Sequence, residues 1–258
     1  IQHIIQHGIP QWSSTIEYQA GKSFVQGSDG LIYKAINTTT NISPVSDTAG
    51  NWSQVSLSPR GLQRFTSAGT FKVPYGVTTV YLSGCAGGAG GSGGGGSINV
   101  AGVGAGGAGG SAGQAVVRLP VTVTPGSTIS VNIGAAGLGG TFGSPSINGG
   151  SGTAGGNTLF GSLLTLTGGS PGGGGTSFTN KGVTDGGIFG PGFPSGSCGQ
   201  DGAIGFNGGV GSGGSGASGP FGGGGGSGRS GSTGITGAPA NGFGGGGGGG
   251  GGGYGTAT

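Results

Sequence analysis

The chain has only five carboxylate side chains for acid–base chemistry, and they are Glu17, Asp29, Asp47, Asp185 and Asp201. A general acid and its base act together at one reacting bond, so two such groups must meet in the fold. No two of the five lie near each other in the sequence, and both histidines fall at the very start of the chain. These residues therefore predict that the protein is not an enzyme.

Metal binding has one candidate site, formed by the two histidines. His3 and His7 are four residues apart, and a helix would place both imidazoles on one face, as a metal pair requires. In a trimer, three such pairs would surround one axis. The alternative, which we prefer, is a frayed terminus with two solvated histidines. We therefore expect no cofactor, with a metal at His3 and His7 as the exception.

The cysteines do not add a second metal site. Cys85 and Cys198 are the only cysteines of the chain, and they could form one disulfide bond. Two cysteines make neither a disulfide framework nor a zinc site. We interpret them as two small, half-buried residues.

Binding is the chemistry that the sequence favours. Bulky side chains interrupt the glycine-rich stretches at 140–149, 176–196 and 218–224. Aromatic residues dominate binding hot spots because they bury much area with few rotatable bonds. The candidate binding residues are Phe142, Phe178, Lys181, Asp185, Ile188, Phe189, Phe193, Phe206 and Phe221. Some of these rings could instead fill the ends of the glycine-rich body, whereas 188–194, stiffened by two prolines, is expected to be exposed.

Composition excludes several other classes of protein. Glycine supplies 79 of the 258 residues, far above the roughly 7% of ordinary proteins. The net charge is only +3, so the self-repulsion of typical disordered chains is missing. The cations are scattered, which argues against nucleic-acid binding. No apolar run is long enough to span a membrane, no signal peptide is visible, and the start at Ile1 suggests a processed product or an excised fragment.

In the first 57 residues glycine is rare, and short strand-like runs are bounded by Gly, Asp and Asn, as in ordinary proteins. We expect a small β-rich module over 1–57, with Trp and Tyr side chains as its apolar core. Two of its strands should be 23–26 and 31–36. They are joined by a hairpin turn at 28–30, where glycine supplies a positive φ.

A glycine-rich domain is expected over residues 65–258, after a linker at 58–64. Its first half contains stretches rich in Val, Ile and Thr, which favour strands. Turns between these stretches are predicted at 75–76, at 124–126 and near Gly161. The expected strands are 70–74, 77–83, 114–123, 127–134 and one or two within 157–167.

In the second half, glycine recurs at every third position. It does so from Gly196 to Gly214 and, in a shifted frame, from Gly213 to Gly237. Three residues per turn is the period of the polyproline II helix. Collagen would need an unbroken repeat and roughly 15–20% proline, whereas this chain has 12 prolines and repeated frame shifts. We therefore predict a bundle of polyglycine II helices, packed closely enough for hydrogen bonds between their backbones.

The predicted fold class is all-β plus polyglycine II, with essentially no α-helix. Each glycine inside an α-helix costs about 1 kcal/mol relative to Ala. Ordering a glycine costs more than one backbone hydrogen bond returns, so strands must brace the glycine helices or several chains must pack together. On such a helix Gly205, Gly208 and Gly211 would lie on one line and face neighbouring backbones.

Residues 65–96, FTSAGTFKVPYGVTTVYLSGCAGGAGGSGGGG, resemble the opening of a glycine-rich domain common in bacteriophage tail fibres. Two later runs, GQAVVRLPVTVTPGSTISVNIGAAGLGG and GNTLFGSLLTLTGG, are similar to its later strands, so the resemblance covers 65–169. It implies a polyglycine II sandwich with receptor-binding loops at its tip, as in the tail-fibre adhesins of T-even-like phages.

The first 57 residues resemble a small chitin-binding-type module of phage fibres. The residues that carry this resemblance are Trp12, Tyr18, Gly21, Val25, Tyr33, Lys34, Ala35, Pro44 and Trp52. Sugar-binding members have exposed aromatic residues just after the Tyr-x-Ala segment, where this chain has Ile36, Asn37 and Thr38. We therefore expect a spacer or docking unit rather than a sugar-binding module.

The resemblance implies a receptor-binding protein at a phage tail-fibre tip, and so a virion protein made in the host cytoplasm. Its expected partners are the rest of the fibre and a bacterial surface receptor, either outer-membrane protein loops or a glycan. Neither nucleic acid nor membrane insertion is expected. We expect a homotrimer, or else one copy that caps a trimeric fibre. The alternative functions are a polyglycine II antifreeze protein with a flat Ala/Ser/Thr face and a structural glycine-rich protein.

Overall fold

A computed structural model describes residues 9–55, 62–74, 77–97, 103–178, 186–188, 196, 211–232 and 234–253. Every regular element in these ranges is a β-strand, so the prediction of an all-β protein without α-helices is confirmed for them. The chain divides into two compact units. The first contains Ile1–Arg64, Lys72–Val80 and Thr122–Thr128, and the second contains Phe65–Phe71, Tyr81–Val121 and Ile129–Thr258.

The first unit contains two small antiparallel sheets. In one, β1 (Glu17–Tyr18) pairs with β4 (Thr39–Thr40). The other has the order β2 (Phe24–Gln26), β3 (Ile32–Ala35) and β5 (Trp52–Val55). The hairpin between β2 and β3 confirms the sequence prediction, and Gly30 in its turn has a φ of 77°.

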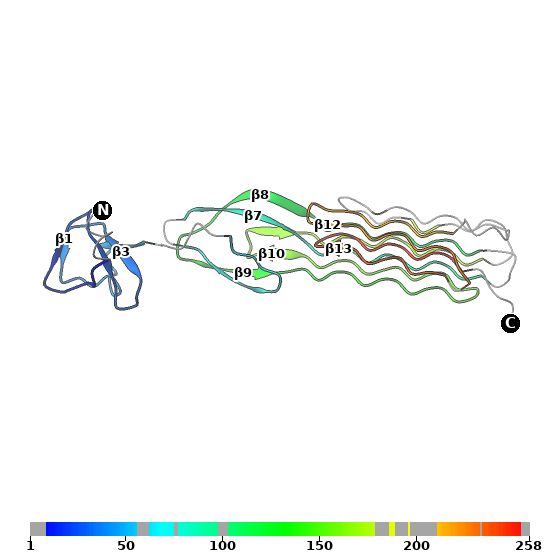
Figure 1. Cartoon of the computed structure of the whole chain (residues 1–258), viewed down its shortest axis with the longest axis horizontal. Coiled ribbons are helices and arrows are strands. Elements are labelled where there is room, and N and C mark those ends of the chain that lie inside the picture. Colours follow the sequence, from blue (N-terminus) through cyan, green and yellow to red (C-terminus); the bar gives the residue numbers. More distant parts are fainter. Residues whose placement is uncertain are drawn as a thin grey trace. The chain divides into compact units, whose positions relative to one another are not determined.

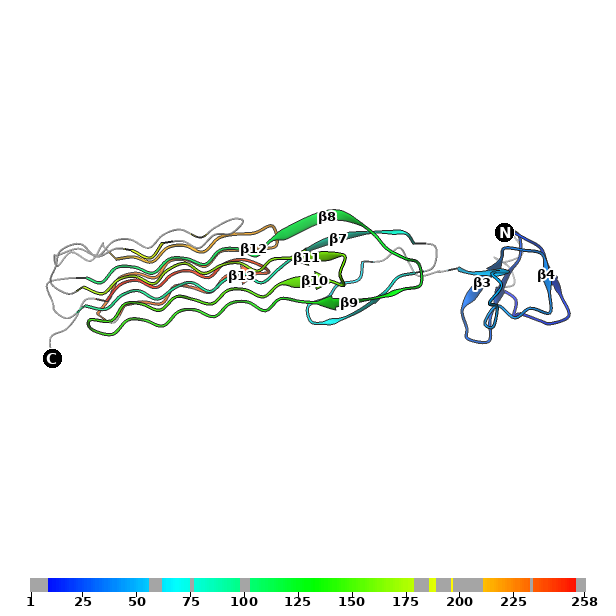
Figure 2. The same cartoon turned by 180° about the vertical axis from the view of Figure 1, so that it is seen from behind.

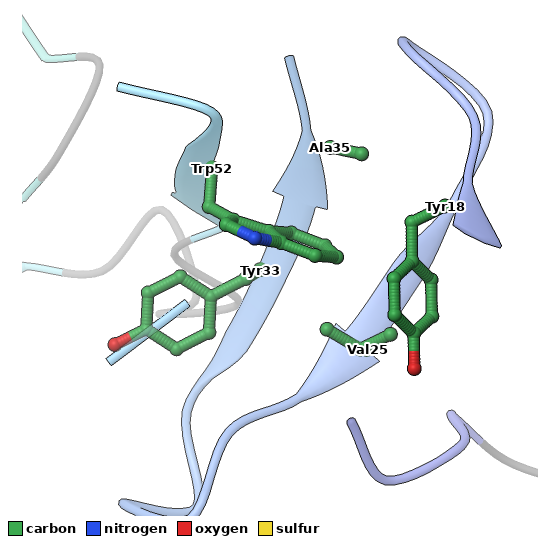
Figure 3. Packing of buried hydrophobic residues seen from close by; sticks show 5 residues of the cluster. All are labelled: Tyr18, Val25, Tyr33, Ala35 and Trp52. Carbon is green, nitrogen blue, oxygen red and sulfur yellow. The ribbon is translucent and has the colours of Figure 1, made fainter. Parts of the chain in front are cut away.

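A compact apolar core holds these two sheets together. Strand residues alternate between faces, so Tyr33 and Ala35 of β3 both point inward, next to Val25 of β2. Tyr18 and Trp52 meet edge to face, with ring centres 5.0 Å apart, an arrangement that adds to the gain from burial alone. Figure 3 shows these five side chains, against which Trp12 also packs.

Two carboxylates hold turns of the first unit. Asp29 accepts hydrogen bonds from the Tyr33 hydroxyl at 2.7 Å and the Leu31 N–H at 3.0 Å, which lower its pKa against a smaller effect of desolvation. Desolvation alone would raise the pKa of Asp47. The N–H groups of Trp52 and Ala49 and the Asn51 side chain donate to this carboxylate, so its pKa also lies below the ordinary value of 3.8.

The first unit should therefore lose stability in acid. A carboxylate with a lowered folded-state pKa stabilises the fold above its unfolded-state pKa and loses that effect as pH falls through the folded value. We expect the fluorescence of the chain's two tryptophans, both in this unit, to report weaker folding below about pH 3.8. Asp47→Asn should flatten this pH dependence, whereas Glu17→Gln, as the control, should not. Identical acid profiles for the Asp47→Asn variant and the parent would contradict the assignment.

Six further strands form two more sheets. β7 (Thr79–Cys85) pairs with β8 (Ala115–Thr122). The other sheet has the order β11 (Leu164–Leu166), β10 (Thr158–Phe160), β9 (Thr128–Asn132) and β6 (Gly69–Lys72). The strands lie where the sequence predicts them, and β10 and β11 form a hairpin with Gly161 at a φ of 52°.

These strands pair differently from what the turns in the sequence suggest. The turn at 124–126 suggests that β8 and β9 form a hairpin, and the turn at 75–76 suggests the same for β6 and β7. Instead each connection crosses between sheets, so β6 lies next to β9 and β7 next to β8. The two connections bond to each other, because Val73 N–H donates to Ser127 O and Val123 N–H donates to Thr78 O. The completely buried Val73 side chain lies at this crossing.

Beyond the strands, the second unit consists of extended, glycine-rich segments that lie side by side (Figures 1 and 2). We call them the glycine bundle. Its members among the described residues are 86–97, 103–114, 134–144, 147–156, 168–178, 211–219, 222–231, 234–240 and 244–253. Within them the only strand is the very short β12 (Gly222–Gly223), which pairs with the equally short β13 (Asn241–Gly242) between the last two segments.

Hydrogen bonds between these segments repeat every three residues. In segment 86–97, the N–H groups that donate to segment 103–114 belong to Ala86, Ala89, Ser92 and Gly95. Those that donate to segment 147–156 belong to Gly87, Gly90, Gly93 and Gly96. The carbonyls of Gly88, Gly91 and Gly94 accept from segment 134–144. The backbone therefore bonds in three directions, whereas a β-strand, with its period of two, bonds in only two.

Three directions of bonding allow more than two neighbours. Segment 86–97 bonds to 103–114, 134–144, 147–156, 168–178 and 244–253. Segment 244–253, made only of glycine, also bonds to five segments, which are 86–97, 103–114, 211–219, 222–231 and 234–240. These two segments are therefore interior members of the bundle, with their backbones mostly buried.

Close approach of backbones explains the glycines. A Cβ added at Gly91 would meet Gly248 O, and one added at Gly248 would meet Gly226 O, both closer than the 3.0 Å that real Cβ atoms keep. Gly211 faces Gly104 O in the same way, as its place in the repeat predicts, while Gly205 and Gly208 lie outside the described residues. Glycine is therefore required because a neighbouring carbonyl occupies the space of a side chain.

Two adjacent glycines test this explanation. A Cβ at Gly225 would collide with Ala238 O and Gly248 N, whereas one at Gly226 has nothing within 4 Å. Gly225→Ala should destabilise the protein by about 1–3 kcal/mol, as overpacking does. Gly226→Ala should be neutral or stabilising by up to about 1 kcal/mol, because it restricts the unfolded chain. Thermal unfolding measures both, and equal melting temperatures for the two variants would refute the packing argument.

Ser92 replaces one direct hydrogen bond of the bundle. Segments 147–156 and 168–178 bond directly where Gly149 N–H donates to Gly175 O and where Gly155 N–H donates to Gly169 O. Between these two bonds the Ser92 hydroxyl is inserted. It accepts from Gly152 N–H at 3.2 Å and donates to Gly172 O at 2.7 Å. This buried side chain thus connects three segments.

Removing the Ser92 hydroxyl should leave a buried donor and a buried acceptor without partners. Ser92→Ala is therefore expected to cost about 1–3 kcal/mol. At about 2–4 °C per kcal/mol, this is a fall of several degrees in the melting temperature. Ser151→Ala, an exposed serine beside Gly152, is the control and should change little. A melting temperature for Ser92→Ala equal to that of the control would show that the bridge contributes nothing.

Candidate functional site

Two chain turns of the described residues meet at one end of the glycine bundle. Gly96 N–H donates to Ile147 O, which places the turn 144–147 beside the end of segment 86–97. Gly231 N–H donates to Gly252 O and Gly253 N–H to Gly95 O, which brings the turn 231–234 to the same end. We call this end the tip. The strands lie at the other end of the bundle, where β7 leads into segment 86–97 (Figure 1).

Three exposed apolar side chains lie at the tip. Phe142 is 37% exposed, Ile147 56% and Ile235 45%. Ile147 lies in a turn that Ser146 enters with a φ of 65°, and Ile235 follows Gly234, whose φ is 70°. Both turns are closed by short hydrogen bonds, from Ile147 N–H to Ser144 O and from Gly234 N–H to Gly231 O. We call Phe142, Ile147 and Ile235 the tip surface.

The Phe142 ring packs directly on glycine. A Cβ at Gly253 would lie 2.7 Å from the ring, and one at Gly234 would also collide with it. Segment 134–144, which carries Phe142, bonds to 86–97 and 147–156, while 234–240 bonds to 222–231 and 244–253. The ring therefore covers a seam between two parts of the bundle, and the side chain remains partly exposed.

Phe178 corrects the sequence prediction. It lies at the tip, because its N–H donates to Gly96 O, but its side chain is only 1% exposed. The ring is therefore unable to contact a partner in this structure. It fills the end of the bundle, which the sequence offered as the alternative role for these aromatic residues.

The other described candidates lie away from the tip. Phe221 is half-buried in a turn next to β12, where Phe243 N–H donates to its carbonyl, so it lies at the strand end of the bundle. Ile188 is 73% exposed and lies on the flank, where its carbonyl accepts from Gly173. The four predicted residues that the structure describes are therefore not gathered into one site. Five further candidates lie outside the described residues, and they are Lys181, Asp185, Phe189, Phe193 and Phe206.

Sequence reasoning missed Ile147 and Ile235. Isolated aliphatic residues carry little signal, because single exposed apolar side chains are common on protein surfaces. The turn-forming residues beside them could have indicated that both lie in exposed turns. Pro145 precedes one, and Gly234 precedes the other.

Catalytic and metal groups are sparse in the described part of the chain. No three His, Cys, Asp or Glu residues come together there as metal ligands, and His3 and His7 lie outside it. Asp29 and Asp47 are engaged in turns. Cys85 is a free, half-buried cysteine, and burial raises the pKa of its thiol, while Cys198 lies outside the described residues.

The first unit offers no exposed ring for stacking on a sugar within residues 9–55. Tyr18, Tyr33 and Trp52 are buried in its core, and Trp12 and Phe24 are half-buried. The residues after the Tyr-x-Ala segment include Ile36, which is 48% exposed but aliphatic. A flat aromatic face is what binds a sugar ring by stacking, and none is presented there.

No described helix has the length and apolar character needed to cross a bilayer. Comparisons with protein-family models, with curated proteins and with solved structures find no match to this chain.

Proposed function

We propose that the segments of the glycine bundle are polyglycine II helices. The three-residue period of their hydrogen bonds supports this, because that helix has three residues per turn. The five bonded neighbours of segments 86–97 and 244–253 also support it, since a β-strand pairs with two at most. The blocked Cβ positions, such as those of Gly91 and Gly248, fit helices packed at backbone distance.

On this basis, we propose that the protein is a receptor-binding tip of a bacteriophage tail fibre. The observation that carries the proposal is the collection of turns at the tip, with Ile147 and Ile235 exposed on them. Turns held by a rigid scaffold are where binding residues concentrate, because their sequence can vary without breaking the scaffold. The resemblance of residues 65–169 to the glycine-rich domain of phage fibres supports the same conclusion.

The partner of the tip would be a bacterial surface receptor, so the protein would act at the virion surface. The first unit would then connect the tip to the rest of the fibre. Its lack of an exposed aromatic ring in 9–55 favours this spacer role over sugar binding. The assembly proposed is a homotrimer, with a single copy capping a trimeric fibre as the alternative.

An adsorption experiment tests the receptor proposal. A panel of bacterial strains with altered surfaces is first screened for binding of the purified chain. On a strain that binds, the double variant Ile147→Ser, Ile235→Ser should lose at least about tenfold in affinity, since buried apolar contacts at hot spots are worth above about 1 kcal/mol. Its melting temperature should stay close to the parent's, because both side chains are about half exposed.

The matched control is Leu163→Ser, which removes a side chain that is 48% exposed in the turn between β10 and β11. It should bind like the parent. If the tip double variant and the Leu163→Ser variant bind equally well, the tip surface is not the receptor site. If no strain of a broad panel binds the parent, the receptor function itself is contradicted.

The antifreeze alternative has one supporting observation. Segment 147–156 exposes a row of small side chains, including Ser151, Thr153 and Ala154. The neighbouring segment 134–144, however, exposes Leu138 and Phe142, which interrupt a flat ice-binding face. A thermal hysteresis assay separates the two functions, because only an ice-binding protein separates the freezing and melting points of its solution.

A further inference from the structure

Among the described residues, the β7–β8 ribbon has two open edges. It is a two-stranded sheet there, so each strand has a described neighbour on one side only. Edge strands carry backbone groups ready to pair with another chain, and proteins usually blunt or cover them. Two residues hinder pairing at the free edge of β8, because Pro120 has no N–H to donate and Arg118 has a φ of 52°. From Tyr81 to Cys85, β7 has neither a proline, nor a charged residue, nor a positive φ.

Both strands of this ribbon expose an apolar side chain. Tyr81 is 65% exposed and Val117 is 62% exposed. Arg118, the next residue of β8, is exposed as well, which interrupts the alternation of a regular strand. A positive φ is unfavourable for a residue with a side chain, and such strain marks places where structure serves a function.

Arg118 is held over Tyr81. Its N–H donates to Ser83 Oγ at 3.0 Å, and its guanidinium carbon lies 5.9 Å from the centre of the Tyr81 ring. The carboxylates of the described residues are Glu17, Asp29 and Asp47, all in the first unit. Within the described part of the second unit, the Arg118 charge is therefore not neutralised by any carboxylate.

The free edge of β7 and the positive charge of Arg118 together indicate what kind of ligand would bind here. We propose that β7 binds an extended segment of another polypeptide, whose outward side chains include both apolar and acidic residues. The backbone of that segment would pair with the free edge of β7, as in other cases of strand addition. Its apolar side chains would cover Tyr81, and a carboxylate would pair with the Arg118 guanidinium.

The positive charge of Arg118 argues against a second copy of this chain as the partner of the β7 edge. Pairing β7 with the β7 of another copy would bring two Arg118 side chains to the same ribbon, and like charges oppose each other. The described residues of the second unit supply no carboxylate to offset them. The proposal is independent of the receptor function, because the ribbon lies at the strand end of the bundle and not at the tip (Figure 2).

Two synthetic peptides test the proposal with the full chain. The probe TVTETVTE presents valine and glutamate on one face of a strand, and TVTKTVTK replaces each glutamate by lysine. Titration followed by NMR should shift the amides of Tyr81–Cys85 with the glutamate peptide. The lysine peptide should bind at least about tenfold more weakly. Added salt should weaken the glutamate peptide, because an exposed ion pair is screened.

One variant isolates the cation. Arg118→Gly removes the charge at a φ that glycine adopts readily, so the fold should melt at or above the parent's temperature. Its affinity for the glutamate peptide should fall at least about tenfold. Arg229→Ala removes another exposed arginine of the second unit and serves as the control, with affinity unchanged.

Three results would overturn the proposal. The first is equal binding of the two peptides, or binding of neither. The second is an Arg118→Gly variant that binds the glutamate peptide like the parent. The third is light scattering that shows dimers which the Arg118→Gly variant strengthens, because a second copy would then be the occupant of the edge.

Discussion

The second unit depends on one interaction, the direct hydrogen bond between glycine backbones at a distance that no Cβ allows. Where that distance is reached, a carbonyl occupies the position of a side chain, as Gly248 O does for Gly91. The interior segments must then be glycine at most positions, and segment 244–253 is glycine throughout. Segments at the surface have free space on one side. They can carry Leu138, Phe142 and Ile235 there without disturbing the bonds beneath.

This scaffold differs in its physics from the first unit. There, burial of Tyr18, Tyr33 and Trp52 supplies the stabilisation, as in ordinary small domains. In the glycine bundle little apolar area is available, so stability depends on the completeness of the hydrogen-bond network. Ser92 shows how strict this is. A hydroxyl that displaces a backbone bond must replace both its donor and its acceptor, and this one does.

The paired strands fix the distance between the glycine-rich segments that continue from them. Segment 86–97 continues from β7, and segment 103–114 leads into β8, so the pairing of these strands aligns two interior segments. β10 and β11 connect segments 147–156 and 168–178 in the same way. The proposed tip and the proposed β7 edge would then be two rigid surfaces at opposite ends of one scaffold.

Sequence alone determined the strands, the turns at Gly30 and Gly161, the three-residue period and, in the described part of the chain, the absence of helices, because these follow from local propensity and spacing. It did not determine which strands pair, since the turn at 124–126 shows only that the chain reverses and not that β8 and β9 separate into different sheets. Nor could it rank the candidate residues. Phe178 and Phe142 have the same chemistry and similar glycine-rich surroundings, yet one ring is buried and the other partly exposed. Gly225 and Gly226 are adjacent and identical, and only the position of Gly248 and Ala238 makes a side chain impossible at one and harmless at the other. In this protein the tertiary structure decides these matters, because space beside the backbone is set by segments far away in the sequence.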